Sequence, residues 1–197
     1  MRTLLGLALM ASSLMVADTA VAALKPGDKA PDFQAHASLA GKEFPFSLAD
    51  ALKRGPVVVY FYPSAYTGGC NIEAHAFAES KDKFDVAGAT IIGVSQDSIA
   101  RLNDFSSDPQ YCAGRFPVAS DADGAIAKSY DLRVTDKRAG SKDSRGQDID
   151  HAFRERTTFI IGHDGKVIAT LSSADGKIAP ADHAEKSLAI VEGLKKP

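Results

Sequence analysis

The stretch YFYPSAYTGGCNIEAHAF, residues 60–77, joins an apolar segment to a helix and places a cysteine at the junction. The run VVVYFY over residues 57–62 shows no alternation of polar and apolar residues, which predicts a strand buried on both faces. Pro63 ends this strand, and a helix is predicted from about Gly69. Cys70 therefore lies in the first turn of a helix and at the carboxyl end of a buried strand, where open α/β sheets bind ligands.

This junction predicts a reactive thiol. Unpaired N–H groups and the positive end of the helix dipole favour a thiolate, so we expect the pKa of Cys70 to lie below its ordinary value. Gly69 has no side chain, so a small substrate can approach its N–H group. Thr67 offers a hydroxyl that both donates and accepts hydrogen bonds. Arg156 is the candidate cation beside the thiol, and Arg154 is its competitor.

Strands and helices alternate along the rest of the chain. The predicted elements are a strand over 89–97, a helix from Ser98, a short strand and turn over 115–124, a short helix over 125–132, a hairpin over 157–171 and a helix over 181–194. The polar stretch 135–150 is predicted to be a surface loop. This order predicts an α/β thioredoxin-like fold with a mixed central sheet flanked by helices.

The N-terminal segment predicts export. Arg2 precedes an apolar run over residues 4–16 that is short for a membrane-spanning helix, and AVA at 20–22 has the pattern of a cleavage site. We therefore expect a signal peptide over 1–22 and one domain over 23–197, located in the periplasm or secreted. The formal net charge of −2 gives no reason to expect nucleic acid or a membrane as a partner.

Three motifs resemble a known family. YPSAYTGGC, residues 62–70, resembles the P-x-x-x-T-x-x-C signature of peroxiredoxins. CNIEAHAF at 70–77 and RERTTFIIGHDGKV at 154–167 are similar to segments of their bacterioferritin-comigratory-protein or PrxQ branch. The resemblance covers most of the mature chain. It implies a thiol peroxidase that reduces hydrogen peroxide and organic hydroperoxides. It implies no metal, haem or flavin cofactor, and a dithiol reductant such as a thioredoxin-like or glutaredoxin-like protein.

The resemblance also implies roles for the residues near the junction. Cys70 would attack the peroxide O–O bond and become a sulfenic acid. Thr67 would orient the peroxide, and Pro63 would shield the sulfur. Arg156 would stabilise the thiolate and the transition state, together with backbone N–H groups that act as an oxyanion hole. Glu73 would pair with Arg156 and fix its side chain.

The second cysteine leaves three alternatives open. His75 occupies the position at which many PrxQ-type proteins have a resolving cysteine. Cys112 lies instead in an insertion over 106–115, where Pro and Gly suggest a mobile segment. We expect Cys112 to form a disulfide with Cys70 in each turnover. The alternatives are a one-cysteine enzyme with Cys112 as a bystander, and a permanent structural bridge.

Three other functions are weighed against this interpretation. An exported thioredoxin-like thiol–disulfide reductase would need C-x-x-C, whereas Glu73 lies three residues after Cys70. A non-enzymatic binding module stapled by one disulfide needs neither Thr67 nor Arg156. A copper carrier would need paired cysteine and histidine ligands. The histidines show no ligand spacing and are predicted to be solvated, namely His36, His75, His151, His163 and His183.

Overall fold

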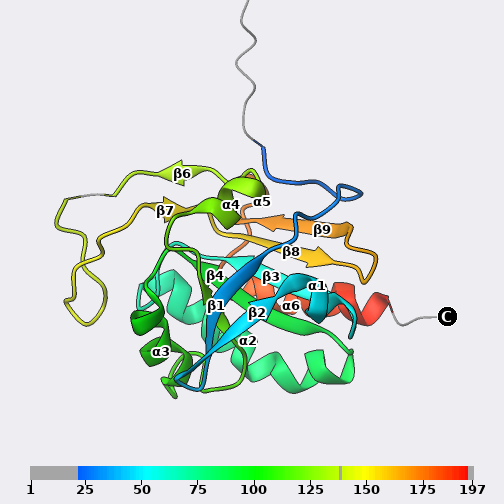
Figure 1. Cartoon of the computed structure of the whole chain (residues 1–197), viewed down its shortest axis with the longest axis horizontal. Helices are drawn as coiled ribbons and strands as arrows, with labels where there is room; N and C mark the ends of the chain where they lie inside the picture. Colours follow the sequence, from blue (N-terminus) through cyan, green and yellow to red (C-terminus); the bar gives the residue numbers. More distant parts are fainter. Residues whose placement is uncertain (1–21, 138, 195–197) are drawn as a thin grey trace, which may run out of the picture.

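The structure, a computed structural model, describes residues 22–137 and 139–194 and is built on one large mixed sheet (Figure 1). The strands of this sheet are β1 (Gln34–Leu39), β2 (Lys42–Ser47), β3 (Val57–Phe61), β4 (Thr90–Ser95), β5 (Val118–Ser120), β8 (Thr157–Ile161) and β9 (Val167–Ser172). Their order is β2-β1-β5-β4-β3-β8-β9. β3, β4 and β5 run parallel and the other pairs are antiparallel, so the predicted mixed sheet is confirmed.

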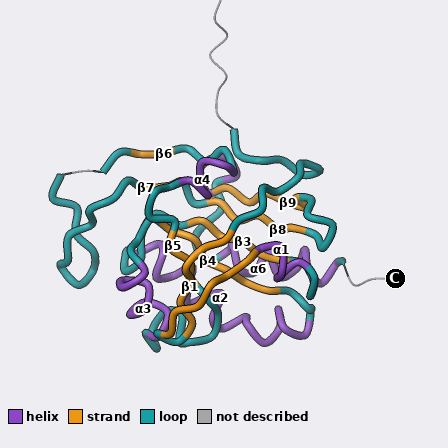
Figure 2. Tube along the Cα trace, in the orientation of Figure 1, coloured by secondary structure: helices purple, strands orange, loops and turns teal. Residues whose placement is uncertain are grey.

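Helices cover both faces of the sheet (Figures 1 and 2). The helices are α1 (Leu48–Leu52), α2 (Gly68–Val86), α3 (Ile99–Ser107), α4 (Ala125–Ser129), α5 (Ser173–Gly176) and α6 (Asp182–Gly193). In β3, Val58 and Tyr60 join the apolar cluster beneath α2, α3 and α6. Their neighbours Val59 and Phe61 join the second cluster, beneath α1 and α4. The prediction of a strand buried on both faces is therefore confirmed.

The structure also departs from the sequence-based expectations. The hairpin of β1 and β2 was not predicted, because β2 is an edge strand interrupted by Pro45 and buries few side chains. The predicted surface loop over 135–150 is anchored, because Asp143 and Ile149 within it are buried. Around this loop, β6 (Val134–Thr135) pairs with β7 (Phe153–Arg154) in a separate two-stranded sheet.

The predicted signal peptide occupies residues 1–22, and residues 1–21 lie outside the described part of the chain. Within residues 22–137 and 139–194, no helix combines the length and the apolar character needed to cross a bilayer.

Gly93 in β4 provides a stability test of the core. A Cβ atom at this position would lie 2.6 Å from Cζ of Tyr60, whose ring stacks on Phe77 with centroids 4.6 Å apart. We expect Gly93→Ala to lower the free energy of unfolding by about 1–3 kcal/mol, because the ring must leave its packed position. Urea unfolding of both proteins measures this change. Gly193→Ala is the matched control, since no atom lies within 4 Å of its added Cβ; equal losses in the two variants would contradict the prediction.

Candidate active site

The site is assembled where β3 turns into α2. The strand ends at Phe61, Thr67 is the N-cap residue of α2, and Cys70 lies in the first helical turn. The Cys70 side chain is buried, with 1% of its surface exposed. The Thr67 hydroxyl donates to the Ser64 carbonyl at 2.8 Å, so it closes the turn that leads into the helix. The predicted junction of strand, turn and thiol is confirmed.

Arg156 reaches the thiol from the neighbouring strand. β8 pairs antiparallel with β3, with Thr157 opposite Phe61, so the residue that precedes β8 lies beside the turn. Nη2 of Arg156 lies 3.2 Å from Sγ of Cys70 and donates to it. A Cβ atom on Gly69 would lie 3.1 Å from the same nitrogen, so only glycine leaves the guanidinium this space. The site-forming arginine therefore sits where we expected it.

Two further contacts distinguish the arginines near the site. Nη1 of Arg156 donates to Oε2 of Glu73, which lies one helical turn after Cys70 and is fully buried. The expected pairing of Glu73 with Arg156 is therefore present. The competitor Arg154 points elsewhere, since its Nη2 lies 3.5 Å from the carbonyl oxygen of Gly124.

The expectation that the pKa of Cys70 is lowered is corrected by the burial of its side chain. Burial raises the pKa of the Cys70 thiol, and this effect exceeds the opposing effects of Arg156, the Thr67 hydroxyl and the Ser64 N–H group. Burial also raises the pKa of Glu73 to about 8, although Arg156 opposes it. The thiolate therefore forms against desolvation, and Arg156 is the charge that most favours it.

Pro63 and Thr67 line a cavity of about 490 Å³. Arg156 lines the same cavity, and Ile149 and Phe153 contribute apolar wall. The site therefore has an adjoining space lined by both polar and apolar side chains.

Cys112 occupies a different environment from the one expected. Both cysteines are free thiols, and Cys112 is fully buried in the apolar cluster that also contains Cys70 and Tyr60. Its segment is held by backbone hydrogen bonds, including Gly114 N–H to the Ser106 carbonyl at 2.8 Å. Burial raises the pKa of the Cys112 thiol well above its ordinary value. The segment that Pro and Gly suggested to be mobile is therefore hydrogen-bonded and carries a buried thiol.

Two histidines are also placed differently from the prediction. His183 is fully buried, with Nδ1 2.8 Å from the Thr158 hydroxyl and Nε2 2.9 Å from the Ser173 hydroxyl. Nε2 of His151 lies 3.0 Å from Oδ1 of the buried residue Asp97. The prediction of solvated histidines is wrong for these two, because their partners are distant in sequence and no local spacing reports them. Among the described residues, no group of three or more His, Cys, Asp or Glu side chains is arranged to hold a metal ion.

His183 makes the stability of the protein depend on pH. Burial, with a smaller effect of the Arg156 charge, lowers the pKa of His183 to about 4. The unfolded chain binds the proton near pH 6.5, so stability falls as pH decreases from 6.5 towards 4. Between pH 7.5 and pH 5 we expect wild type to lose about 2 kcal/mol more unfolding free energy than His183→Gln. Urea unfolding at both pH values measures this difference, and parallel losses would refute it.

Asp97 is the main residue of this region that sequence reasoning missed. It lies two residues after the end of β4, at the same edge of the sheet as the turn before Cys70. The carboxyl ends of parallel strands converge at such an edge, and this position is the signal that points to Asp97. No comparable sequence pattern points to Asp143, which lies in the 135–150 loop, or to His151, which directly follows this loop.

Comparisons with known proteins agree with the geometry. The family profile described as AhpC/TSA matches residues 26–170. A peroxiredoxin Bcp of Xanthomonas campestris is 33% identical over 71% of this chain and 78% of its own. The crystal structure of peroxidoxin BcpB from Mycobacterium tuberculosis has a TM-score of 0.72 and 29% identity, over 88% of this chain and 99% of its own.

A second solved structure adds information about substrates. It is a bacterioferritin comigratory protein of Xanthomonas campestris, described with alkyl peroxide reduction activity and solved as trapped intermediate and ligand complexes. It has a TM-score of 0.63 and 30% identity, over 82% of this chain and 92% of its own. These neighbours confirm the thioredoxin-like fold and the resemblance to the Bcp or PrxQ branch.

Proposed function

The chain belongs to the AhpC/TSA family and is a thiol peroxidase of the peroxiredoxin type, and from this premise we propose that Cys70 is its peroxidatic cysteine. We propose hydrogen peroxide and organic hydroperoxides as its substrates. The observation that carries the proposal is the 3.2 Å contact between Arg156 Nη2 and Cys70 Sγ at the N-terminus of α2. This contact supplies the positive charge that a buried thiolate requires.

In the proposed reaction, the Cys70 thiolate attacks one peroxide oxygen. The S–O bond forms as the O–O bond breaks, and the departing oxygen takes a proton to leave as water or an alcohol. Cys70 becomes a sulfenic acid. Arg156 and the N–H groups near Gly69 stabilise the developing negative charge, while the Thr67 hydroxyl orients the peroxide. Glu73 fixes the guanidinium.

Two further groups shape this step in the proposal. Pro63 lines the cavity beside Thr67 and shields the sulfur from water. The peroxide enters the same cavity, whose polar end carries Arg156. Shielding favours a sulfenic acid that survives until a thiol reaches it.

We propose Cys112 as the resolving cysteine. Its thiol would attack the Cys70 sulfenic acid, form the disulfide and release water. A dithiol protein of the thioredoxin-like or glutaredoxin-like class would then reduce the disulfide. Because Cys112 is buried and its segment is held by backbone hydrogen bonds, we also propose that this segment opens before the disulfide forms.

We also propose that the protein is exported after removal of residues 1–22 and acts in the periplasm or outside the cell. The small-x-small pattern at residues 20–22 supports this proposal. Mass spectrometry of the mature protein from the periplasmic fraction of the native host tests it, and a mature chain that retains residues 1–22 would contradict it.

The test of the catalytic proposal is a thiol count. The reduced protein receives one equivalent of hydrogen peroxide, and free thiols are counted after a few seconds. Loss of both thiols in wild type, with a sulfenic acid trapped in Cys112→Ser, supports the two-cysteine cycle. Loss of only one thiol would exclude Cys112 as the resolving cysteine. Survival of both thiols would overturn the proposal and favour a structural or binding role for the cysteines.

Phe153 gives a prediction for organic substrates. Its ring lines the cavity that Thr67 and Arg156 also line. We expect Phe153→Ser to raise KM for cumene hydroperoxide about tenfold and to leave KM for hydrogen peroxide unchanged, because only the larger substrate is big enough to contact this ring. Steady-state kinetics with both peroxides measure this contrast. Phe44→Ser in β2 is the matched control outside the cavity, and equal effects of the two variants would contradict the prediction.

A further inference from the structure

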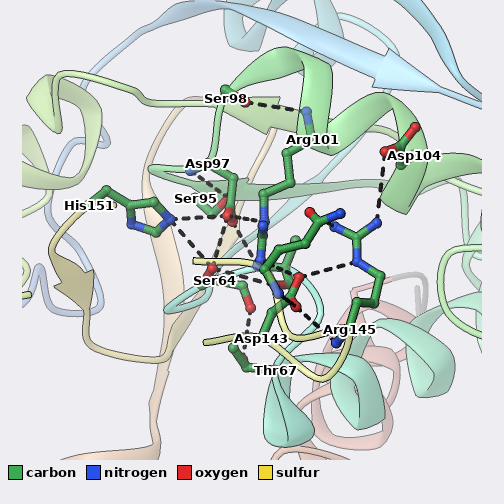
Figure 3. Close-up of polar contacts among 12 residues, drawn as sticks. Ser64, Thr67, Ser95, Asp97, Ser98, Arg101, Asp104, Asp143, Arg145 and His151 are labelled. Carbon is green, nitrogen blue, oxygen red and sulfur yellow. Dashed lines mark hydrogen bonds and ion pairs between the residues drawn. The ribbon is translucent and has the colours of Figure 1, made fainter. Parts of the chain in front are cut away.

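A network of charged side chains surrounds the turn that carries Ser64 and Thr67, and the proposed reaction does not use it (Figure 3). At its centre is Asp97, which is fully buried. Oδ1 of Asp97 accepts the Ser64 hydroxyl at 2.9 Å, and Oδ2 accepts the Ala65 N–H at 2.7 Å. One carboxylate therefore holds two consecutive residues of the turn.

Two basic side chains lie against this buried carboxylate. Nε2 of His151 lies 3.0 Å from Oδ1, and Nε of Arg101 lies 2.9 Å from the same oxygen. Burial acts to raise the pKa of Asp97, yet the hydrogen bonds from His151, Ala65 and Ser95 hold it below its ordinary value. A buried carboxylate with this many partners is fixed in position, because moving it would leave several charged groups unpaired.

Arg101 extends the network to the other side of the turn. Its Nη2 donates to the carbonyl of Ala65 at 3.0 Å and to Oδ2 of Asp143 at 2.8 Å. Asp143 belongs to the 135–150 loop and is itself buried. The backbone of Ala65 is therefore held on both sides: its N–H donates to Asp97, and its carbonyl accepts from Arg101.

The next residue of the turn is strained and is also held by the loop. Tyr66 has φ of +61°, in the left-handed region that bulky side chains rarely adopt. Its carbonyl accepts the N–H of Ser144 at 2.8 Å, and the guanidinium of Arg145 lies 3.3 Å from the centre of its ring. The strained conformation therefore depends on contacts from outside the turn.

The Ser64–Thr67 turn orients two groups that favour the thiolate form of Cys70. The Ser64 N–H and the Thr67 hydroxyl both lower the pKa of Cys70. Thr67 is in turn tied to the Ser64 carbonyl. A shift of the turn would move both groups relative to the sulfur.

We propose that Asp97, with His151 and Arg101, is a positioning residue for peroxide reduction, because it fixes the Ser64–Thr67 turn against the sulfur of Cys70. This inference rests on the proposed role of Cys70 as the peroxidatic cysteine. None of these three side chains is required to touch the peroxide.

The test uses Asp97→Asn in a Cys112→Ser background, so that Cys70 is the only thiol. The rate of iodoacetamide alkylation is measured across pH to give the pKa of Cys70, and the rate of sulfenic acid formation is measured with hydrogen peroxide. We expect the pKa of Cys70 to rise and the peroxide rate to fall about tenfold or more, because the donors lose their alignment. Removing a negative charge without any movement would instead lower the thiol pKa.

Those opposite directions make the outcomes distinct. A lowered pKa, or an unchanged pKa and rate in a folded variant, would overturn the positioning role. If Asp97→Asn raises the pKa of Cys70 but the wild-type protein does not react with peroxide, the positioning role of Asp97 would be supported and the proposed function overturned. Asp85→Asn, on the exposed end of α2, is the matched control and should change neither quantity.

His151 supplies an independent variant if Asp97→Asn does not fold. His151→Ala removes the contact with Asp97, and His151→Gln keeps an N–H donor of similar reach. We expect the alanine variant to raise the pKa of Cys70 and the glutamine variant to restore part of the loss. An equal pKa of Cys70 in wild type and both variants would overturn the role of His151 and the proposed positioning of the turn by Asp97.

Discussion

Replacing Cys70 by serine should reduce peroxide consumption to the background rate. A serine hydroxyl is not ionised near neutral pH and is a poor nucleophile towards an O–O bond, whereas a thiolate is a strong one. Because the Cys70 side chain is buried and serine is nearly isosteric, the change should leave the fold intact. Peroxide consumption with a reducing dithiol measures the effect, and thermal unfolding verifies folding.

The companion variant for this test is Cys112→Ser. It should still react once with hydrogen peroxide, because Cys70 and Arg156 remain in contact. In Cys70→Ser, by contrast, the Cys112 thiol should survive one equivalent of peroxide, since burial holds it protonated. Rapid oxidation of Cys112 in Cys70→Ser would reverse the assignment of the two thiols.

Replacing Arg156 by methionine should lower the second-order rate of Cys70 oxidation about 100- to 1000-fold. This is the typical loss when one donor to a developing negative charge is removed. In the proposed reaction the loss would have two physical sources, since the guanidinium favours the thiolate and would also stabilise the departing oxygen. The rate of sulfenic acid formation at several pH values separates them, because only the first source is recovered at high pH.

Arg154→Met is the matched control for this prediction. The residue is also an arginine, lies two positions earlier and lines the same cavity, but its Nη2 lies 3.5 Å from the Gly124 carbonyl oxygen. We expect its rate to stay within about threefold of wild type, in keeping with a charge that does not touch the sulfur. Similar losses for the two arginines would indicate a general charge effect and remove Arg156 from the site.

The sequence carries the local part of the site and misses the part built by distant contacts. The buried run over 57–62 predicts β3, and the turn before Cys70 follows from the spacing of Pro63, Thr67 and Gly69. Arg156 was predicted by its position before an apolar strand, and β-sheet pairing then brought it to the thiol. These features are encoded within short segments of chain.

The remaining features depend on packing that no local pattern reports. The 135–150 loop looks like a solvated connection because it is polar, yet its Asp143 is buried against Arg101. The pKa of Cys70 was expected to be lowered on the basis of the helix terminus alone. Its burial became visible only in the assembled core and proved to be the larger effect. Long-range pairs between ionised groups and the depth of a side chain are properties of the tertiary structure.

The burial of Cys112 has a kinetic consequence for the proposed cycle. If its segment must open before the disulfide forms, the opening free energy adds to the barrier of that step, and each 1.4 kcal/mol slows it about tenfold. During this delay the sulfenic acid at Cys70 is exposed to a second peroxide, which would convert it to the irreversible sulfinic acid. The packing of the core around Cys112 would thus set the rate of disulfide formation, and with it the peroxide concentration at which Cys70 is over-oxidised.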